Sequence, residues 1–426
     1  MSKVVCAPVS ILPSAIVTGV NYFSLYSYSH RDGIGHIAPT LRSDVKKKGF
    51  SPSIRVWDFV SIALAVAAAD LSCKRSSSAD GWTRIIEVDV YLYEAAPWLS
   101  QKLLLEKTLR TLTGDFWTLN FISGGEPPPQ ASIRVSYDAD CISLLSGGMD
   151  SLIGAIDLTA AGRKPLFVSQ VVRGDRATQE MFANALGARG RCFCWSHPVS
   201  NLNRCETSTR ARSIIFFAFG LLAAASLNPS ADAPIEIIVP ENGFMSLNPP
   251  LNAGRSGSFS TKTTHPVYVS GLQEILDAVN IPVKLSFPYR FKTKGEILGE
   301  CLDQVKLIDL IGRSTSCGKF GRYGLIHCGR CLPCMVRRAA FLKAQVTDST
   351  VNNYHFQNLA TTGRESGAND IGAMAVAYLN YRKYGIQRFA GGVLSFASSV
   401  DRSRYEGVIS RGMDELGQLL ISHGVI

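Results

Sequence analysis

The chain has 426 residues, of which 46% are hydrophobic and 18% are charged. This composition belongs to a globular protein large enough for two or more domains, and it excludes a disordered chain. The 44 lysine and arginine residues outnumber the 34 aspartate and glutamate residues, which leaves a net charge of +10. A positive excess suits an anionic partner, either a nucleotide or a nucleic acid, although a solvated surface accounts for it equally well.

The sequence predicts no membrane span, because its longest apolar run, residues 213–227, is shorter than the ~20 residues that a spanning helix needs. That run predicts a buried helix instead. The N-terminal residues carry a single lysine, and proline interrupts their apolar run, so we expect no signal peptide. Eleven cysteines, four of them clustered, indicate a reducing compartment and a metal site rather than disulfides. We therefore expect a cytoplasmic protein without a membrane partner.

Residues 1–136 precede the first chemical motif, and we expect them to form an accessory α+β domain. Apolar runs and alternating patterns predict a buried helix over 55–73, a half-buried strand over 85–93, a helix over 98–112 and a strand over 115–122. The proline- and glycine-rich residues 124–130 mark a turn or linker. Because this part shows no catalytic constellation, we interpret it as a scaffold or a docking surface for a partner.

Strands and helices alternate from residue 141 onward. The predicted strands are 141–145, 165–172, 191–195, 235–239 and 283–287. The predicted helices are 151–161, 177–187, 209–227 and 268–279. Such alternation predicts an α/β fold in which helices cover both faces of a parallel sheet. In open sheets of this kind, ligands bind at the carboxyl ends of the strands.

The first of these strands runs directly into Ser146-Gly147-Gly148-Met149-Asp150-Ser151 and then into a helix. This arrangement cradles a phosphate, because glycines let the backbone approach the anion and a helix N-terminus favours negative charge. The two serines add hydroxyl donors. The aspartate would be an anion beside anions, which indicates that it places a cation or orients a ligand. No Gly-Lys-Ser/Thr follows, so the loop is not a Walker A motif; a turn that binds nothing is the alternative.

Other charged residues stand where the strands end or the helices begin. Arg210 and Arg212 open the long apolar helix, where their charges oppose the helix dipole and call for an anion. A phosphate fits, since a guanidinium binds it bidentately, and a salt bridge is the alternative. Glu241 and Asn242 at a strand end are able to bind a base edge or a metal, or simply to cap a turn. Lys292, Lys294 and Glu296 form a further charged cluster, with a solvated helix start as the alternative.

Four cysteines, Cys317, Cys328, Cys331 and Cys334, follow the spacing C-x10-C-x2-C-x2-C. Four thiolates at these separations fit a tetrahedral, structural zinc site with no open position. An iron–sulfur cluster is the alternative, and zinc is favoured because the composition is not that of a redox protein. Seven lysines and arginines, and no acidic residue, lie between residues 311 and 346. This basic segment is a candidate site for an anionic ligand or partner, with a solvated helix face as the alternative.

The loop at residues 146–151 resembles the SGGxDS loop of the PP-loop ATP pyrophosphatases, which release pyrophosphate from ATP and leave an adenylated substrate. A C-G-x-C-x-x-C cluster follows later in the same domain. The two motifs in this order resemble QueC, the 7-cyano-7-deazaguanine synthase family, over residues 137–346. The resemblance implies a Rossmann-like, HUP-type sheet with a zinc loop held by four cysteines.

The chain departs from the QueC pattern at both ends. It has the domain of residues 1–136 in front and residues 347–426 behind, where helices over 367–384 and 403–422 predict a helical extension. The segment around Glu241 and Asn242 also differs from the substrate loop of the biosynthetic enzyme. In these respects the chain is more similar to QatC, the QueC-like component of the bacterial Qat anti-phage defence system.

The resemblance implies an ATP-dependent C–N ligase that uses Mg²⁺ and carries Zn²⁺. ATP would lie on Ser146, Gly147, Gly148, Met149, Asp150, Ser151 and Arg212, and the candidate catalytic residues are Asp150, Ser146 and Ser151. A deazapurine-like carboxylate would be adenylated and transferred to an amine. The amine would be ammonia, or would belong to a partner protein encoded in the same operon.

Three alternatives remain at this stage. The first is 7-cyano-7-deazaguanine synthesis for queuosine-type biosynthesis. The second is a tRNA-modifying PP-loop protein; the charge permits a nucleic-acid partner, but no RNA-binding module is recognisable in residues 1–136. The third is a non-catalytic binding subunit, against which the intact loop argues. A glutamine-dependent synthetase is disfavoured, since residues 1–136 cannot hold an amidotransferase domain.

Overall fold

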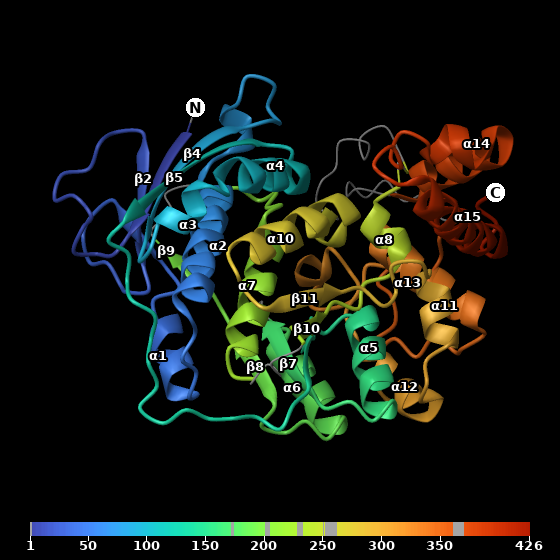
Figure 1. Ribbon diagram of the computed structural model, residues 1–426. Coiled ribbons are helices and arrows are strands. Elements are labelled where there is room, and N and C mark those ends of the chain that lie inside the picture. The colour runs from blue at the N-terminus through green and yellow to red at the C-terminus, as the bar shows by residue number, and fades with distance from the viewer. Residues whose placement is uncertain are drawn as a thin grey trace.

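The computed structural model describes residues 2–171, 174–200, 205–227, 233–249, 251, 262–360 and 370–426. Within these residues the strands form two sheets, one of six strands and one of five. Figure 1 shows the N-terminal sheet in blue to teal except for the green β9, the central sheet in green and yellow, and a pair of C-terminal helices in red on the far side of the central sheet. Among the described residues, no helix combines the length and apolar character that crossing a bilayer requires.

The N-terminal sheet has the strand order β5-β4-β1-β2-β3-β9. Its strands are β1 (Ser2–Ala7), β2 (Val20–Leu25), β3 (Ile34–Ile37), β4 (Ile85–Leu92), β5 (Phe116–Ser123) and β9 (Val199–Ser200). β1 to β5 pair in parallel, and β9 joins the edge antiparallel to β3. We expected an α+β domain here; the parallel pairing makes it an α/β layer instead. The sequence did not indicate β1, β2 and β3, and β9 comes from beyond residue 136.

The helices of this layer are α1 (Leu41–Lys47), α2 (Ile54–Ser72), α3 (Ala96–Leu99) and α4 (Lys102–Thr113), with a 3₁₀ turn at Arg75–Ser77. The predicted helix over 55–73 corresponds to α2, whose N-cap Ser53 accepts a hydrogen bond from the Val56 N–H. The predicted helix over 98–112 is divided between α3 and α4. α4 ends at Gly114, whose φ of 75° is the left-handed conformation that glycine adopts without strain.

The central sheet has the order β11-β10-β6-β7-β8, and all of its pairings are parallel. Its strands are β6 (Cys141–Leu144), β7 (Pro165–Gln170), β8 (Cys192–Trp195), β10 (Ile235–Ile238) and β11 (Val283–Ser286). The helices between them are α5 (Met149–Ala160), α6 (Arg176–Ala185), α7 (Arg212–Ala224) and α10 (Pro266–Ala278). The predicted α/β fold with a parallel sheet is therefore confirmed. The end of the predicted strand 165–172, at residue 172, lies outside the described residues.

The strand order reverses between β6 and β10, the point at which open α/β sheets bind ligands. The nucleotide-loop candidate follows β6 directly, and Glu241 and Asn242 follow β10. The topology thus brings two segments that are far apart in sequence to the same crevice.

One hydrophobic core joins the two sheets. Helix α2 packs against α7, and both helices are buried along almost their whole length between the sheets. The same cluster of buried side chains includes Val88 of the N-terminal sheet, Leu166 of the central sheet and Ile215 of α7. Residues 1–136 therefore pack as a layer on the central domain, without a solvated gap between the two.

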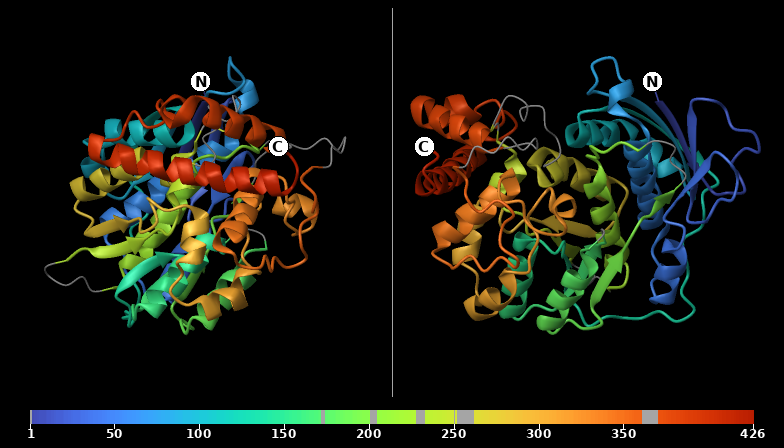
Figure 2. Two further views of the ribbon diagram at one scale, coloured as in Figure 1. Left: turned by 90° about the vertical axis from the view of Figure 1, so that its right-hand side faces the viewer. Right: turned by 180° about the vertical axis from the view of Figure 1, so that it is seen from behind.

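The remaining helices lie on the far side of the central sheet, beyond α5. They are α8 (Gly243–Leu247), α11 (Lys294–Gly299), α12 (Gln304–Ile311), α13 (Leu332–Ala344), α14 (Asp370–Ala390) and α15 (Ser399–Ser422), with 3₁₀ turns at Lys262–Thr264 and Phe320–Tyr323. α14 and α15 pack on each other, and α15 packs on α13 and α8 (Figure 2). The helices predicted over 367–384 and 403–422 correspond to α14 and α15, although residues 367–369 lie outside the described part.

Candidate active site and metal centre

The loop after β6 is folded by its own serines. Gly147 has a φ of 87°, a left-handed conformation that favours glycine. Ser146 Oγ accepts from the Gly148 N–H at 3.2 Å and lies 3.0 Å from Ser151 Oγ, which in turn donates to the Gly148 carbonyl. The Thr315 N–H donates to the Gly147 carbonyl at 2.9 Å, which ties the loop to the segment that leads to the cysteines. Both serine hydroxyls thus lie at the start of α5, where a phosphate would be bound.

The loop opens on a cavity of about 430 Å³. Its wall includes Ser146, Gly148, Asp150 and Ser151 from the loop, Arg212 from α7, Glu241 after β10, Lys294 from α11 and Thr315. A volume of this size is typical of sites for nucleotides and other small molecules. Met149 also borders the cavity, but its side chain is buried in the core, so it offers the cavity only its backbone.

Asp150 is held from two sides and is 5% exposed. Its Oδ2 accepts from the Asn242 side-chain amide at 2.6 Å and from the Asn242 N–H at 3.2 Å. Its Oδ1 forms an ion pair with the Lys294 ammonium. Lys294 is only 8% exposed, so for this residue the alternative of a solvated helix start is wrong. α11 begins at Lys294 behind the capping box of Thr293 and Glu296, and the helix start faces the cavity rather than solvent.

Glu241 and Asn242 have separate roles. Asn242 caps α8, because its Oδ1 accepts from the Met245 N–H at 3.0 Å, and its amide nitrogen binds Asp150. Burial, together with the neighbouring Asp150, raises the pKa of the Glu241 carboxyl to about 8, against the opposing effect of Lys294. Two carboxyl groups and one ammonium therefore gather at the crevice between β6 and β10. Two such carboxylates are suitable oxygen ligands for a divalent cation.

The two arginines at the start of α7 are placed differently. Arg212 lines the cavity, where its Nε donates to Gln170 Oε1 at 3.3 Å. Arg210 is buried, donates to the Thr113 carbonyl at 2.9 Å and stacks on Trp82, with its guanidinium 4.1 Å from the ring centre. Both arginines border the cavity, but the Arg210 guanidinium contacts the Thr113 carbonyl and Trp82 and fastens the helix start to the N-terminal layer, so we expect Arg212 to face an anion in the cavity.

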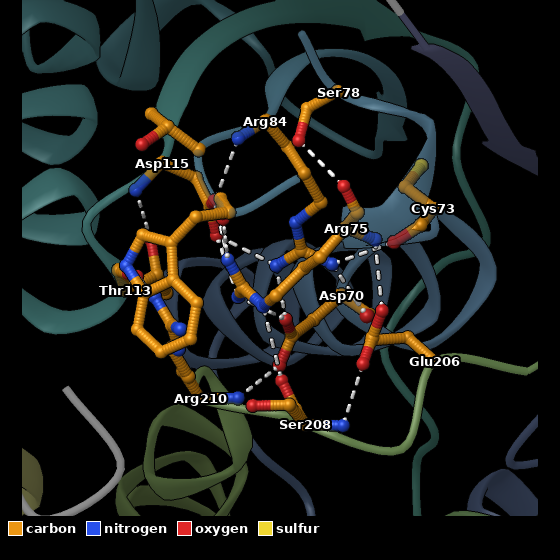
Figure 3. A network of polar contacts seen from close by, with 12 residues as sticks. Asp70, Cys73, Arg75, Ser78, Arg84, Thr113, Asp115, Glu206, Ser208 and Arg210 are labelled. Carbon is orange, nitrogen blue, oxygen red and sulfur yellow. Dashed lines mark hydrogen bonds and ion pairs between the residues drawn. The ribbon is translucent and has the colours of Figure 1, made fainter. Parts of the chain in front are cut away.

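A buried ionic network holds this helix start in place (Figure 3). Asp70 Oδ2, on α2, accepts from the N–H groups of Arg210 at 2.6 Å and Ala211 at 2.7 Å. Arg84 bridges Asp70 and Asp115, with contacts of 2.5 and 2.6 Å. Arg75 pairs bidentately with Asp115, at 2.7 and 2.9 Å. Each carboxylate is compensated by guanidinium groups, which is how charges remain stable in a protein interior.

The four cysteines form one buried cluster. Their sulfur atoms all lie within 4.8 Å of one another, and the pairs Cys317–Cys331 and Cys328–Cys334 are each 3.9 Å apart. A tetrahedral zinc ion with bonds of about 2.3 Å separates its sulfur ligands by about 3.8 Å, so the cluster fits zinc. The N–H of Cys328 points to the Cys317 sulfur at 3.3 Å, and the N–H of Cys331 to the Cys328 sulfur at 3.3 Å. These donors stabilise thiolates, and all four ligand positions are occupied by protein.

Two arginines of the basic segment around the cysteines are bonded within the protein. Arg337 is completely buried, and its guanidinium donates to Ser314, Ile311 and Thr350. Arg338 donates to the Gln357 carbonyl at 2.8 Å. The expectation that these arginines gather an anionic ligand is therefore wrong for this pair, since their donors satisfy the carbonyls of neighbouring loops. The cysteine cluster and its arginines instead support the Thr315 wall of the cavity.

Comparison with known proteins gives two partial matches. The chain is 35% identical over 86 residues to the 7-cyano-7-deazaguanine synthase of Methanocaldococcus jannaschii, which covers 20% of this chain and 37% of that protein. It is 34% identical over 137 residues to the 7-cyano-7-deazaguanine synthase of Agrobacterium fabrum, which covers 32% of this chain and 49% of that protein.

No family model matches the chain, and no solved structure matches it. The matched part spans less than half the length of either curated relative. Both relatives are named as 7-cyano-7-deazaguanine synthases, so neither match tests the similarity to QatC of the Qat anti-phage system. Together with the parallel α/β fold and the four-cysteine cluster, the two matches support a distant relationship of this chain to the QueC-like 7-cyano-7-deazaguanine synthases.

Proposed function

We propose that the protein is an ATP-dependent C–N ligase that adenylates the carboxylate of a 7-deazapurine and transfers the acyl group to an amine. The observation that carries this proposal is the placement of Asp150, Glu241 and Lys294 beside the SGGxDS loop in one cavity. The similarity to two 7-cyano-7-deazaguanine synthases supplies the substrate class.

In the proposed reaction the loop and the start of α5 bind the ATP phosphates. A substrate carboxylate oxygen attacks the α-phosphorus, and the bond to pyrophosphate breaks. Lys294 and Arg212 offset the negative charge that grows on the departing pyrophosphate. Ser146 and Ser151 donate hydrogen bonds to phosphate oxygens once these replace the contact between the two hydroxyls. Catalysis on this scheme comes from positioning and charge rather than from a covalent enzyme intermediate.

The cofactors have separate places in this scheme. Asp150 and Glu241 would hold Mg²⁺, which neutralises phosphate charge when bound. Because Asp150 is already paired with Lys294, the ammonium supplies positive charge at that position in the free protein. Zn²⁺ in the cysteine cluster would be structural, since four protein ligands leave no position for substrate.

The first candidate acceptor is ammonia, as in the biosynthesis of 7-cyano-7-deazaguanine. The ammonia nitrogen attacks the acyl carbon of the adenylate. The bond from this carbon to the phosphate oxygen breaks, and AMP leaves with that oxygen. A second activation by ATP then dehydrates the amide to the nitrile. The activity for which both relatives are named supports this candidate over the anti-phage role.

The second candidate acceptor is an amine of a partner protein, as the Qat resemblance implies. A specific observation favours it: a second cavity of about 630 Å³ adjoins the first and shares Thr264 with it. Its walls come from all three parts of the chain, with Leu104 on α4, Val267 on α10 and Tyr405 on α15. The segments outside the QueC-like part thus enclose space beside the nucleotide cavity, where a partner's amine-bearing segment would be placed.

The test is an incubation with ATP and a 7-carboxy-7-deazapurine, with ammonium or with candidate partner proteins encoded beside the gene. Formation of AMP, pyrophosphate and the nitrile with ammonium alone supports the biosynthetic reaction. A partner that gains the mass of one deazapurine acyl group, with little ATP turnover in its absence, supports protein conjugation. The absence of AMP under both conditions, with zinc-loaded protein, contradicts the proposed function.

A further inference from the structure

The C-terminal helix α15 contacts the turn that begins α11 on both sides of Lys294. Glu415 on α15 is 5% exposed. Its Oε1 accepts from the Thr293 hydroxyl, and its Oε2 accepts from the Gly295 N–H at 3.3 Å. Thr293 and Gly295 are the two neighbours of Lys294 in sequence, so one carboxylate fixes the backbone before and after the lysine.

Two further features make this contact close. A Cβ at Gly295 would lie 2.7 Å from Glu415 Oε1 and 2.7 Å from Lys343 Cγ, so only glycine permits the approach. Arg411, one turn earlier on α15, donates to the Phe291 carbonyl at 2.9 Å and forms an ion pair with Glu296 at 2.5 Å. Residues 291–296 are therefore attached to α15 at several points.

The position of the Lys294 ammonium depends on this backbone. Lysine has a flexible four-carbon side chain, and holding it in one place costs rotamer entropy. In the structure the side chain reaches from the α11 turn to Asp150, across the crevice between β6 and β10. A shift of the turn would move the ammonium away from the carboxylate.

We propose that Glu415 is a positioning residue for Lys294, so that α15 sets the charge that faces the nucleotide loop. The C-terminal helices are then part of the nucleotide site, although none of the described residues of α14 and α15 lines the cavity around Asp150. The placement of Lys294 follows from the contacts themselves; only its consequence for ATP binding rests on the proposed function.

The first measurement is the labelling rate of Lys294 by an amine-reactive reagent on the native, full-length protein, followed by peptide mass spectrometry. In the wild type, burial and the Asp150 ion pair keep this lysine slow to react. Glu415→Ala removes both hydrogen bonds to the α11 turn and is expected to raise the Lys294 rate about tenfold or more, since each factor of ten corresponds to ~1.4 kcal/mol. Glu406→Gln is the matched control, because Glu406 lies on the same helix and pairs with Arg402 instead of α11.

A second pair of variants separates positioning from folding. Thr293→Val removes the hydroxyl that donates to Glu415 and is expected to raise the Lys294 labelling rate, whereas Thr293→Ser keeps the donor and restores the wild-type rate. Because the Thr293 hydroxyl also accepts from the Glu296 N–H at 3.1 Å and so caps α11, Glu415→Gln is added: it leaves this cap intact, loses one acceptor oxygen, and is expected to raise the Lys294 labelling rate as well. If Glu415→Ala fails to fold, this pair carries the test alone.

The affinity for ATP, measured by calorimetry, supplies the functional readout. The proposal expects weaker ATP binding by Glu415→Ala and by Thr293→Val, and unchanged binding by Glu406→Gln. Faster labelling of Lys294 with unchanged ATP binding would support the positioning role while contradicting the phosphate role that the proposed function gives to Lys294. Wild-type labelling of Lys294 in folded Glu415→Ala or Thr293→Val would overturn the positioning role itself.

Discussion

The substitution Asp70→Ala tests whether the N-terminal layer holds the wall of the nucleotide cavity. Asp70 is 1% exposed and accepts from Arg84 and from the N–H groups of Arg210 and Ala211. The alanine variant leaves both N–H groups buried and unpaired, at a cost of about 1–3 kcal/mol each. It also removes one of the two carboxylates that compensate Arg84, and breaking a buried pair costs about 3–5 kcal/mol when no second partner remains.

Because Arg84 keeps its contact with Asp115, we expect Asp70→Ala to lower the free energy of unfolding by about 3–5 kcal/mol, a large part of the ~5–15 kcal/mol typical of a folded protein. Asp70→Asn retains one acceptor oxygen and should cost less, about 1–3 kcal/mol. Urea unfolding followed by circular dichroism measures the change. Tryptophan fluorescence reports the local effect, since Trp82 stacks on Arg210.

The control is Asp138→Ala. Asp138 is exposed and pairs with Lys164, so its loss should change the free energy of unfolding by less than about 0.5 kcal/mol. The folded fraction of Asp70→Ala should also bind ATP more weakly, because the start of α7 carries Arg212. Equal urea midpoints for Asp70→Ala and the control would refute the role that we assign to the network.

Four further predictions concern the site itself. Metal analysis should find one zinc per chain, and Cys331→Ser should lose the metal and lower stability without altering the loop; iron in place of zinc would contradict the structural assignment. Asp150→Asn should abolish AMP and pyrophosphate formation while circular dichroism stays unchanged, so turnover near the wild-type rate would rule out the mechanism. Gly148→Val should weaken ATP binding measured by calorimetry, because even its Cβ would stand 3.3 Å from the Thr315 carbonyl oxygen at the mouth of the loop. Burial raises the pKa of Glu241 to about 8, so the neutral carboxyl contributes fully to the free energy of unfolding below its ordinary pKa of about 4.5, and this contribution is lost as the pH rises towards 8. Mg²⁺-dependent ATP binding should become tighter over the upper part of that pH range in the wild type, as the carboxyl ionises, and should not do so in Glu241→Gln.

The sequence by itself determined those features whose chemistry is local. The loop at 146–151 unites its glycines and serines within six consecutive positions, and the four cysteines stand within eighteen residues. Alternating strand and helix patterns likewise predicted the parallel central sheet, because a buried strand and an amphipathic helix each carry their pattern in a few successive residues. In the N-terminal sheet the alternating pattern predicted β4 and β5, whereas β1 and β2 were missed because buried and partly buried residues do not alternate regularly along them, and β3 was missed as well.

Only the tertiary structure decided which charges meet. Lys294 and Asp150 are 144 positions apart, and Glu415 and Thr293 are 122 apart. Hydrophobic periodicity shows which face of an element is buried, but a lone lysine or glutamate in a sequence is most simply interpreted as exposed. Such a charge is buried only where folding supplies its partner, and the partner comes from whichever segment the sheet topology brings to the same crevice. The strand order therefore placed Lys294 and Glu241 beside Asp150. The packing of α15 placed Glu415 against Thr293 and Gly295, the two neighbours of Lys294 in sequence.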